Sequence, residues 1–526
     1  MKTVIHLIRP LVLTLLALAI TSTTLAQTVS IPDPGLNAAI RAALEIPTAP
    51  LTAQDLLALR NLDASRRHVK STVGLDAARN LVSLNLQINE LTNFAIPTTL
   101  TNLLVLDLTG NPLTSLAPPG VLTNLASLTA EGCSLTNLTI PETLTGLTNL
   151  DVEGNFISVF NLPSNLTSLV FLDLGFNLFT NYSLPGGLTN LSSFYFAGNP
   201  LTNVTLPSDL SGMTELNLSQ NLLTNFTLPT GMTHLEELDL AFNQLTNVTL
   251  PDDLLNLSEL ELDFNQLTGL SFPSNLTSLS FLHLRANLFT NFTLPAGLTG
   301  LTYLDVSAGP LQVISLPAGL SHLNALRIAG NTNLTSLILP PGMTNLTAAF
   351  LAGNRLTNVV LPPDLNRLET LDLGGNLLTN LTLPRGLIHL TGLFFVGNQV
   401  TMLTLPPDMT NLVSLGFLAN PFTTLVVPEA LDTTNLGGFG GTLQSQGISV
   451  FSYPLTVSMI SLRRTPDGSF QFAVSGPPGI YTVLASTDQI GWSDLATVTN
   501  ELGFARFEDE QANLSPQKFY NARSAP

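Results

Sequence analysis

Six carboxylate side chains that recur at regular spacings are the residues of this sequence best suited to bind a ligand: Glu215, Glu237, Asp239, Glu259, Glu261 and Asp263. Glutamate returns every 22 positions, and a second carboxylate follows two positions after several of these glutamates. Oxygen ligands at such spacings can bind a divalent cation, attract a basic partner, or simply keep an apolar protein soluble. All three interpretations remain open, although no calcium-loop spacing supports the first, and we expect no metal and no cofactor.

Aromatic and cationic residues accompany the carboxylates: Phe242, Phe264, Phe281, His283, Arg285 and Tyr303. Aromatic side chains next to charge suit a partner that carries both basic and apolar groups. We therefore take the six carboxylates and these six residues together as the candidate ligand-binding site.

Catalytic residues cannot be assembled from the remaining side chains. The sequence contains no HExxH motif, phosphate-binding loop or nucleophile elbow. Histidines outside the first 26 residues are scattered at positions 68, 234, 283, 322 and 389, and Cys133 is the only cysteine. One cysteine excludes a disulfide framework and zinc sites that need several thiolates. We expect a protein that is not an enzyme.

The charge balance excludes two classes of partner. The chain has 526 residues, of which 10% are charged, and a formal net charge of -18. A nucleic-acid-binding protein needs a basic face to neutralise phosphates. A protein that attaches to an anionic membrane through a polybasic segment also needs a cluster of positive charges. Neither partner fits this composition.

The elements that must position the carboxylates are repeats. Asparagine recurs at intervals of 22 or 44 from Asn89 to Asn331, and the series resumes from Asn354 to Asn420. Two members of the series are replaced, by Cys133 and Gly309. Proline follows eight residues after each position, and one inserted residue shifts the register before Pro340.

One repeat unit, residues 235–251, has the sequence LEELDLAFNQLTNVTLP. It resembles the leucine-rich repeat pattern L-x-x-L-x-L-x-x-N/C-x-L, and Cys133 fits its N/C position. Sixteen units match across residues 81–430. In each Leu-x-Leu segment the leucines face inward and the intervening residue faces outward. We predict an α/β-type solenoid dominated by parallel β structure, a horseshoe of about 16 units, with buried asparagines and an extended or 3₁₀-like outer side that proline interrupts.

The two ends of the solenoid need caps. Residues 1–26 have the pattern of a signal peptide, with Lys2, Arg9 and an apolar run that is too short to anchor in a membrane. Residues 27–80 are expected to form a helical N-terminal cap, with Asp33 near a helix start. This segment resembles the caps of bacterial leucine-rich repeat proteins such as the internalins, which implies protein partners.

The composition changes near the C-terminus. We expect a cap or linker at residues 431–455, in which the run 437–441 is a glycine-rich loop, and a small all-β, sandwich-like module at 456–526 with five short strands. Trp492, Phe519 and Tyr520 are expected in its core, with a sugar-stacking surface as the alternative. The tail resembles C-terminal modules of secreted proteins from soil and aquatic bacteria, notably the Verrucomicrobia group, which implies life outside the cell.

The function expected from these features is non-catalytic recognition of an extracellular protein or peptide through the concave face of the solenoid. The alternative is a glycan-binding or cell-envelope structural or adhesion protein. We expect a secreted, periplasmic or cell-surface location, no nucleic-acid partner, and no membrane span after signal cleavage.

Overall fold

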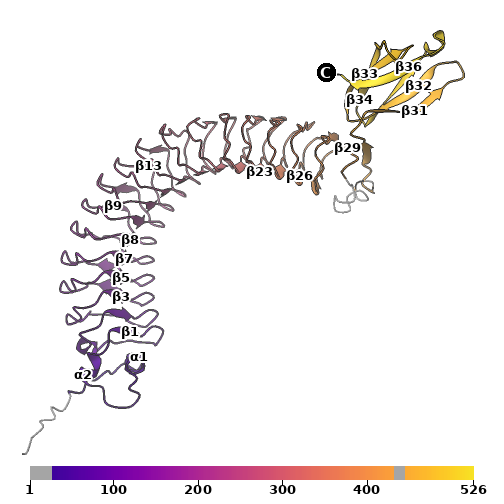
Figure 1. The fold of residues 1–526 in the computed structure, drawn as a ribbon. Helices are drawn as coiled ribbons and strands as arrows, with labels where there is room; N and C mark the ends of the chain where they lie inside the picture. The colour runs from indigo at the N-terminus through magenta and orange to yellow at the C-terminus, as the bar shows by residue number, and fades with distance from the viewer. Residues whose placement is uncertain (1–26, 432–442, 444, 526) are drawn as a thin grey trace, which may run out of the picture.

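The structure is a computed structural model that describes residues 27–431, 443 and 445–525. The expected signal peptide and the glycine-rich run 437–441 lie outside these residues. Figure 1 shows an arch of stacked coils followed by a small β module. Strands such as β23 (Ala348–Phe350) and β26 (Gly392–Phe394) line the inner side of the arch. Other short strands, such as β9 (Asn181–Ser183) and β13 (Asn225–Thr227), lie on its outer side. The predicted leucine-rich solenoid is confirmed.

The inner side is one parallel sheet of 17 strands. Each strand pairs with the equivalent strand of the next coil, so that Leu238 lies beside Leu216 and Leu260. The sheet begins one strand before the first unit that carries the repeat motif. Its strands are β1 (Asn61–Asp63), β2 (Ser83–Asn85), β3 (Val105–Asp107), β5 (Ser127–Thr129), β7 (Asn149–Asp151), β8 (Phe171–Asp173), β10 (Ser193–Tyr195), β12 (Glu215–Asn217), β14 (Glu237–Asp239), β16 (Glu259–Glu261), β17 (Phe281–His283), β19 (Tyr303–Asp305), β21 (Ala325–Arg327), β23 (Ala348–Phe350), β25 (Thr370–Asp372), β26 (Gly392–Phe394) and β28 (Ser414–Gly416).

The outer side carries a second, interrupted set of parallel strands. These strands are β4 (Ser115–Leu116), β6 (Asn137–Leu138), β9 (Asn181–Ser183), β11 (Asn203–Thr205), β13 (Asn225–Thr227), β15 (Asn247–Thr249), β18 (Asn291–Thr293), β20 (Val313–Ser315), β22 (Ser336–Ile338), β24 (Asn358–Val360), β27 (Met402–Thr404), β29 (Thr424–Pro428) and β30 (Ser449–Tyr453). Most of them pair only in twos, and β27, β29 and β30 form a group of three. The extended outer side was predicted from the sequence, but the pairing was not. Proline has no N–H to donate, which keeps each of these strands short.

The repeated asparagine holds neighbouring coils together. The Asn243 side-chain oxygen accepts a hydrogen bond from the Leu223 amide at 3.0 Å, and its nitrogen donates to the carbonyls of Leu218 and Leu240 at 3.0 and 3.1 Å. The side chain is buried. It therefore satisfies backbone groups of two coils that the apolar core would otherwise leave unpaired.

Cys133 occupies the asparagine position of its coil, where it supplies the hydrogen-bond donor but not the acceptor. Its thiol donates to the Leu108 carbonyl at 3.3 Å, as an asparagine would. It has no amide oxygen to offer, and the Leu113 amide instead donates to the Asn111 carbonyl at 2.8 Å. Burial raises the pKa of the thiol. These contacts support a structural position for the cysteine.

The coils around Gly309 are irregular in their hydrogen bonds but not in their strand register. The Asn331 side-chain oxygen bonds to the Gly309 amide at 3.1 Å, and the Asn354 oxygen bonds to the Asn331 amide at 2.7 Å. The inserted residue is absorbed in a turn at 332–333. The strands on either side still pair in order, so the sheet continues unbroken.

The N-terminal cap consists of α1 (Pro34–Leu44), α2 (Ala53–Leu56) and the 3₁₀ turn η1 (Leu75–Ala77). Asp33 is the N-cap of α1, where its carboxylate accepts from the Leu36 amide at 2.9 Å. It also accepts from the amides of Lys70 and Ser71, which fastens the helix to the first coils. Burial opposes ionisation, yet these backbone donors hold the pKa of Asp33 below its ordinary value.

The C-terminal module has two three-stranded antiparallel sheets. One contains β31 (Ser458–Arg464), β32 (Phe470–Ser475) and β35 (Phe504–Asp509); the other contains β34 (Ser493–Asn500), β33 (Gly479–Ser486) and β36 (Phe519–Ser524), and η2 (Ala512–Leu514) precedes β36. The five strands predicted from the sequence are present, and β36 was missed.

Two aromatic residues of the module, Tyr520 and Trp492, lie in different environments. Tyr520 packs against the cluster of Phe472, Val474 and Val483, as expected. The core placement of Trp492 was wrong, because this side chain is 38% exposed and its indole N–H donates to the Gln489 carbonyl. Trp492 lies at the loop that enters β34, where local hydrogen bonds rather than inter-sheet packing position it.

Candidate functional site

The candidate site lies on the inner sheet, where outward side chains form columns across the strands. One column contains Glu215, Glu237 and Glu259, which are directly paired in register. A second runs through Asn217, Asp239 and Glu261. Asp263 lies just beyond the end of β16, where it accepts a hydrogen bond from the Arg285 amide at 2.6 Å. Because adjacent strands are only about 4.8 Å apart, the six predicted carboxylates form one patch.

The environment of this patch opposes full ionisation. Partial burial, followed by the neighbouring charges of Asp239 and Glu259, raises the pKa of Glu261 to about 7. Burial also raises the pKa of Glu237, Asp239 and Asp263. Carboxylates held together against their own repulsion favour a cation or a cationic group placed between them.

A histidine borders the patch at the next coil. His283 continues the Glu261 column, and its Nε2 lies 3.7 Å from the Glu259 carboxylate. The ring of His283 also stacks on Tyr303, with the centroids 4.8 Å apart. Ligand atoms of Glu259, Glu261 and His283 lie within 4.8 Å of one another, so these three side chains could together hold a metal ion.

The predicted aromatic residues fall into two places. Phe281 and Tyr303 extend the glutamate column along the sheet. Phe242 and Phe264 lie instead in the turns just after the strands, where their rings stack at 4.4 Å with planes 9° apart. The Arg285 guanidinium lies 5.6 Å from the centre of the Phe264 ring. The twelve predicted residues therefore form one continuous surface, with a stacked aromatic pair along one edge.

The backbone of this aromatic pair is strained. Phe242 and Phe264 have φ angles of 55° and 54°, in the left-handed region that bulky residues rarely adopt. Glycine occupies the equivalent turn in many coils, and larger residues such as Ile88, Phe176 and Gln220 occupy it in others. Glycine would form the same turn without the cost of about 1–2 kcal/mol that the left-handed region imposes on other residues. Both rings are also substantially exposed, at 52% and 40%.

A second acidic group lies nearer the N-terminus and was not selected from the sequence. Asp151, Glu153 and Asp173 have ligand atoms within 4.8 Å of one another. Burial and the charges of Asp151 and Glu153 raise the pKa of Asp173 to about 7. Phe176 has a φ of 48° in the turn that follows and is 48% exposed. The sequence does place these carboxylates at outward positions of the repeats, but spacing alone does not show how deeply they are buried.

Comparison with protein families gives the decisive observation about the repeats. The BspA-type leucine-rich repeat region matches in six copies, over residues 86–172, 174–294 and 264–377, which is more than half of the chain. The chain belongs to the BspA-type leucine-rich repeat family. This membership agrees with the repeat unit, the buried asparagines and the parallel sheet. A search of curated proteins found no match.

Solved structures with similar folds are also leucine-rich repeat proteins. YopM from Yersinia enterocolitica WA-314 is 24% identical, with a TM-score of 0.53, and the match covers 74% of this chain and 87% of that one. The functional domain of InlJ from Listeria monocytogenes is 19% identical, with a TM-score of 0.52 and coverage of 86% and 97%. YopM from Yersinia pestis is 22% identical, with a TM-score of 0.50 and coverage of 73% and 92%. Because all three sequence identities are below 25%, these similarities establish a shared fold and nothing about a shared function.

The described part of the chain contains no helix with the length and apolar character needed to cross a membrane.

Proposed function

We propose that this BspA-type leucine-rich repeat protein is a non-catalytic scaffold that works outside the cell, secreted or at the cell surface, and recognises a protein or peptide partner through its inner sheet. Repeat proteins present such concave surfaces for binding. The extracellular location rests on the signal-like pattern of residues 1–26.

The observation that carries the proposal is the strained, exposed pair of Phe242 and Phe264 next to the acidic columns. The fold does not require phenylalanine there, because glycine serves in equivalent turns. The left-handed turn itself belongs to every repeat, so the feature that exceeds the needs of the fold is the pair of exposed, stacked rings that it carries. Residues held in such strained conformations are often found at functional sites. Aromatic rings would anchor the apolar groups of the partner, and the carboxylates of Glu237 and Glu261 would attract its basic groups.

The proposal is tested by selecting binders from a random peptide library displayed on phage, with the full chain immobilised. We expect the recovered peptides to be enriched in Lys, Arg and apolar residues. Phe264→Ala should weaken a selected peptide by more than about 1 kcal/mol. Glu261→Lys should slow association mainly at low salt, because charges about 10 Å apart are screened at 0.1 M.

The matched controls place the same substitutions on the outer strands β15 and β18. Thr249→Lys and Thr293→Ala alter exposed positions on the far side of the coils. If all four variants bind a selected peptide alike, the inner sheet is not the binding surface.

A further inference from the structure

A separate concave surface lies on the C-terminal module, away from the solenoid site. The outer face of the β31–β32–β35 sheet carries an open cavity of about 700 Å³, a size within the usual range for small-molecule sites. Phe472 and Val474 of β32 point into the module core. Side chains therefore alternate along this strand, and Gln471 and Ala473 face outward.

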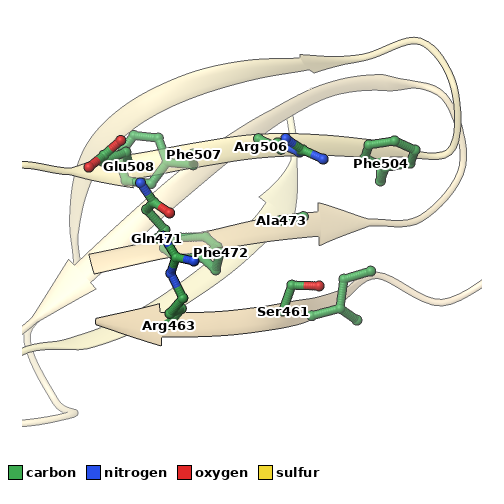
Figure 2. A pocket seen from close by; sticks show the side chains of 10 residues that line it. Ser461, Arg463, Gln471, Phe472, Ala473, Phe504, Arg506, Phe507 and Glu508 are labelled. Carbon is green, nitrogen blue, oxygen red and sulfur yellow. The ribbon is translucent and has the colours of Figure 1, made fainter. Parts of the chain in front are cut away.

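Strand pairing places the outward residues in rows. One row contains Arg463, Gln471 and Glu508, and the next contains Ile460, Ala473 and Arg506. Figure 2 shows Arg463, Gln471 and Arg506 on three adjacent strands, with the small Ala473 on the middle strand. The cavity exists because a methyl group lies at the centre and longer side chains surround it.

A β-bulge places two of these side chains on the same face. The register of β31 shifts between Ile460 and Arg463, and Ser461 within this bulge has a φ of 57°. In a regular strand, residues three apart would point to opposite faces. The bulge instead directs Ile460 and Arg463 to the same side, which is how bulges commonly shape sites.

The charge of the cavity is opposite to that of the whole protein. Arg463 and Arg506 are exposed and form no ion pair among the described residues, although the chain carries a net charge of -18. One acceptor lies beside them, since Glu508 accepts a hydrogen bond from the Ser469 hydroxyl. Two unpaired guanidinium groups favour a carboxylate, which they can bind in a bidentate manner.

We propose that this cavity binds a carboxylate-bearing saccharide. Arg463 and Arg506 would hold the carboxylate groups, and Phe504, which is 40% exposed at the rim, would cover the apolar C–H face of a sugar ring. Gln471 and Glu508 offer acceptors that hydroxyl groups can use. A ligand with only acidic groups would be repelled by Glu508, whereas a sugar acid has hydroxyl groups to place there.

The test is calorimetric titration of the full chain with a galacturonic acid trimer, a neutral galactose trimer and a glutamate hexapeptide. We expect the acid trimer to bind at least about tenfold more tightly than either of the others. Arg463→Gln and Arg506→Gln should each weaken its binding about tenfold, the size expected for a lost hydrogen bond to a charged group. Ala473→Leu should also weaken binding, because it places a larger side chain on the floor of the cavity beside Arg506.

The control is Arg523→Gln on β36, which removes an exposed arginine of the other sheet that pairs with Asp494. It should leave binding unchanged, and the melting temperatures of all variants should match that of the parent chain. Absence of binding to the acid trimer, equal binding of the neutral trimer or the peptide, or an equal loss in Arg523→Gln would each overturn the proposal. None of these outcomes depends on the inner sheet of the solenoid.

Discussion

Replacing Asn243 by alanine tests the physical basis of the solenoid directly. The Leu223 amide has the Asn243 side-chain oxygen as its acceptor, at 3.0 Å, and alanine would leave this buried donor unpaired. The Leu218 carbonyl would lose one donor but keep another, the Asn221 side chain, at 3.0 Å. The Leu240 and Ala241 carbonyls would also lose a donor, but each keeps another, the Asn265 side chain and the Gln220 amide. One fully orphaned amide and three weakened carbonyls correspond to a destabilisation of about 1–3 kcal/mol.

The assay is urea unfolding followed by circular dichroism, combined with hydrogen exchange of the amides in the coils on either side of the substitution. Exchange is informative because repeat proteins are held by neighbour contacts and can open locally. The control is Asn256→Ala, which removes an exposed side chain whose nitrogen donates to the Thr233 carbonyl. If Asn243→Ala is no less stable than Asn256→Ala, and the Leu223 amide exchanges no faster, the buried asparagines do not hold the coils together.

Three further predictions concern individual side chains. Cys133→Asn should raise the urea midpoint or leave it unchanged, since the new amide oxygen can accept from Leu113; a lower midpoint would show that the thiol has a role of its own. The raised pKa of Glu261, about 7 against an ordinary 4.5, means that the folded chain keeps a proton that the unfolded chain releases, so this group lowers stability as the pH rises from about 4.5 to 7. Glu261→Gln should remove that slope, and identical pH profiles would contradict the burial argument. The lowered pKa of Asp33 has the opposite sign: its contribution is present above about 3.8 and is lost as the pH falls below that value. In Asp33→Asn the amide oxygen can still accept from Leu36, but the amide nitrogen cannot accept from Lys70 and Ser71, so this variant should be less stable at neutral pH and should lack the acid loss.

The solenoid could be predicted because its decisive contacts repeat in sequence. Leu238 meets Leu216 and Leu260, and Asn243 contacts the coil before it, so residues that touch are separated by one repeat length. A period of 22 residues therefore specifies both the sheet and the identity of its buried polar ladder. The same argument explained Cys133, because its position in the period was sufficient.

The candidate site was only partly accessible to this reasoning. The spacing of Glu237 and Glu259 showed that they share a face, and the structure does bring them together. It did not show that Phe242 and Phe264 adopt left-handed turns, because the repeat motif leaves that position open to glycine and other residues. It also did not single out Asp173, whose raised pKa depends first on burial.

The sequence by itself determined the inward leucines, the asparagine ladder and the acidic columns, since each of these follows from a fixed period between neighbouring coils. Only the tertiary structure decided how the strands of the C-terminal module pair. There, β33 pairs with both β34 and β36, and β32 pairs with β35 although residues 476–503 lie between them in the chain. Antiparallel pairing between distant segments is set by packing and turn geometry and leaves no period in the sequence. For that reason the strand β36, the exposed Trp492 and the bulge that turns Arg463 toward the cavity became visible only in three dimensions.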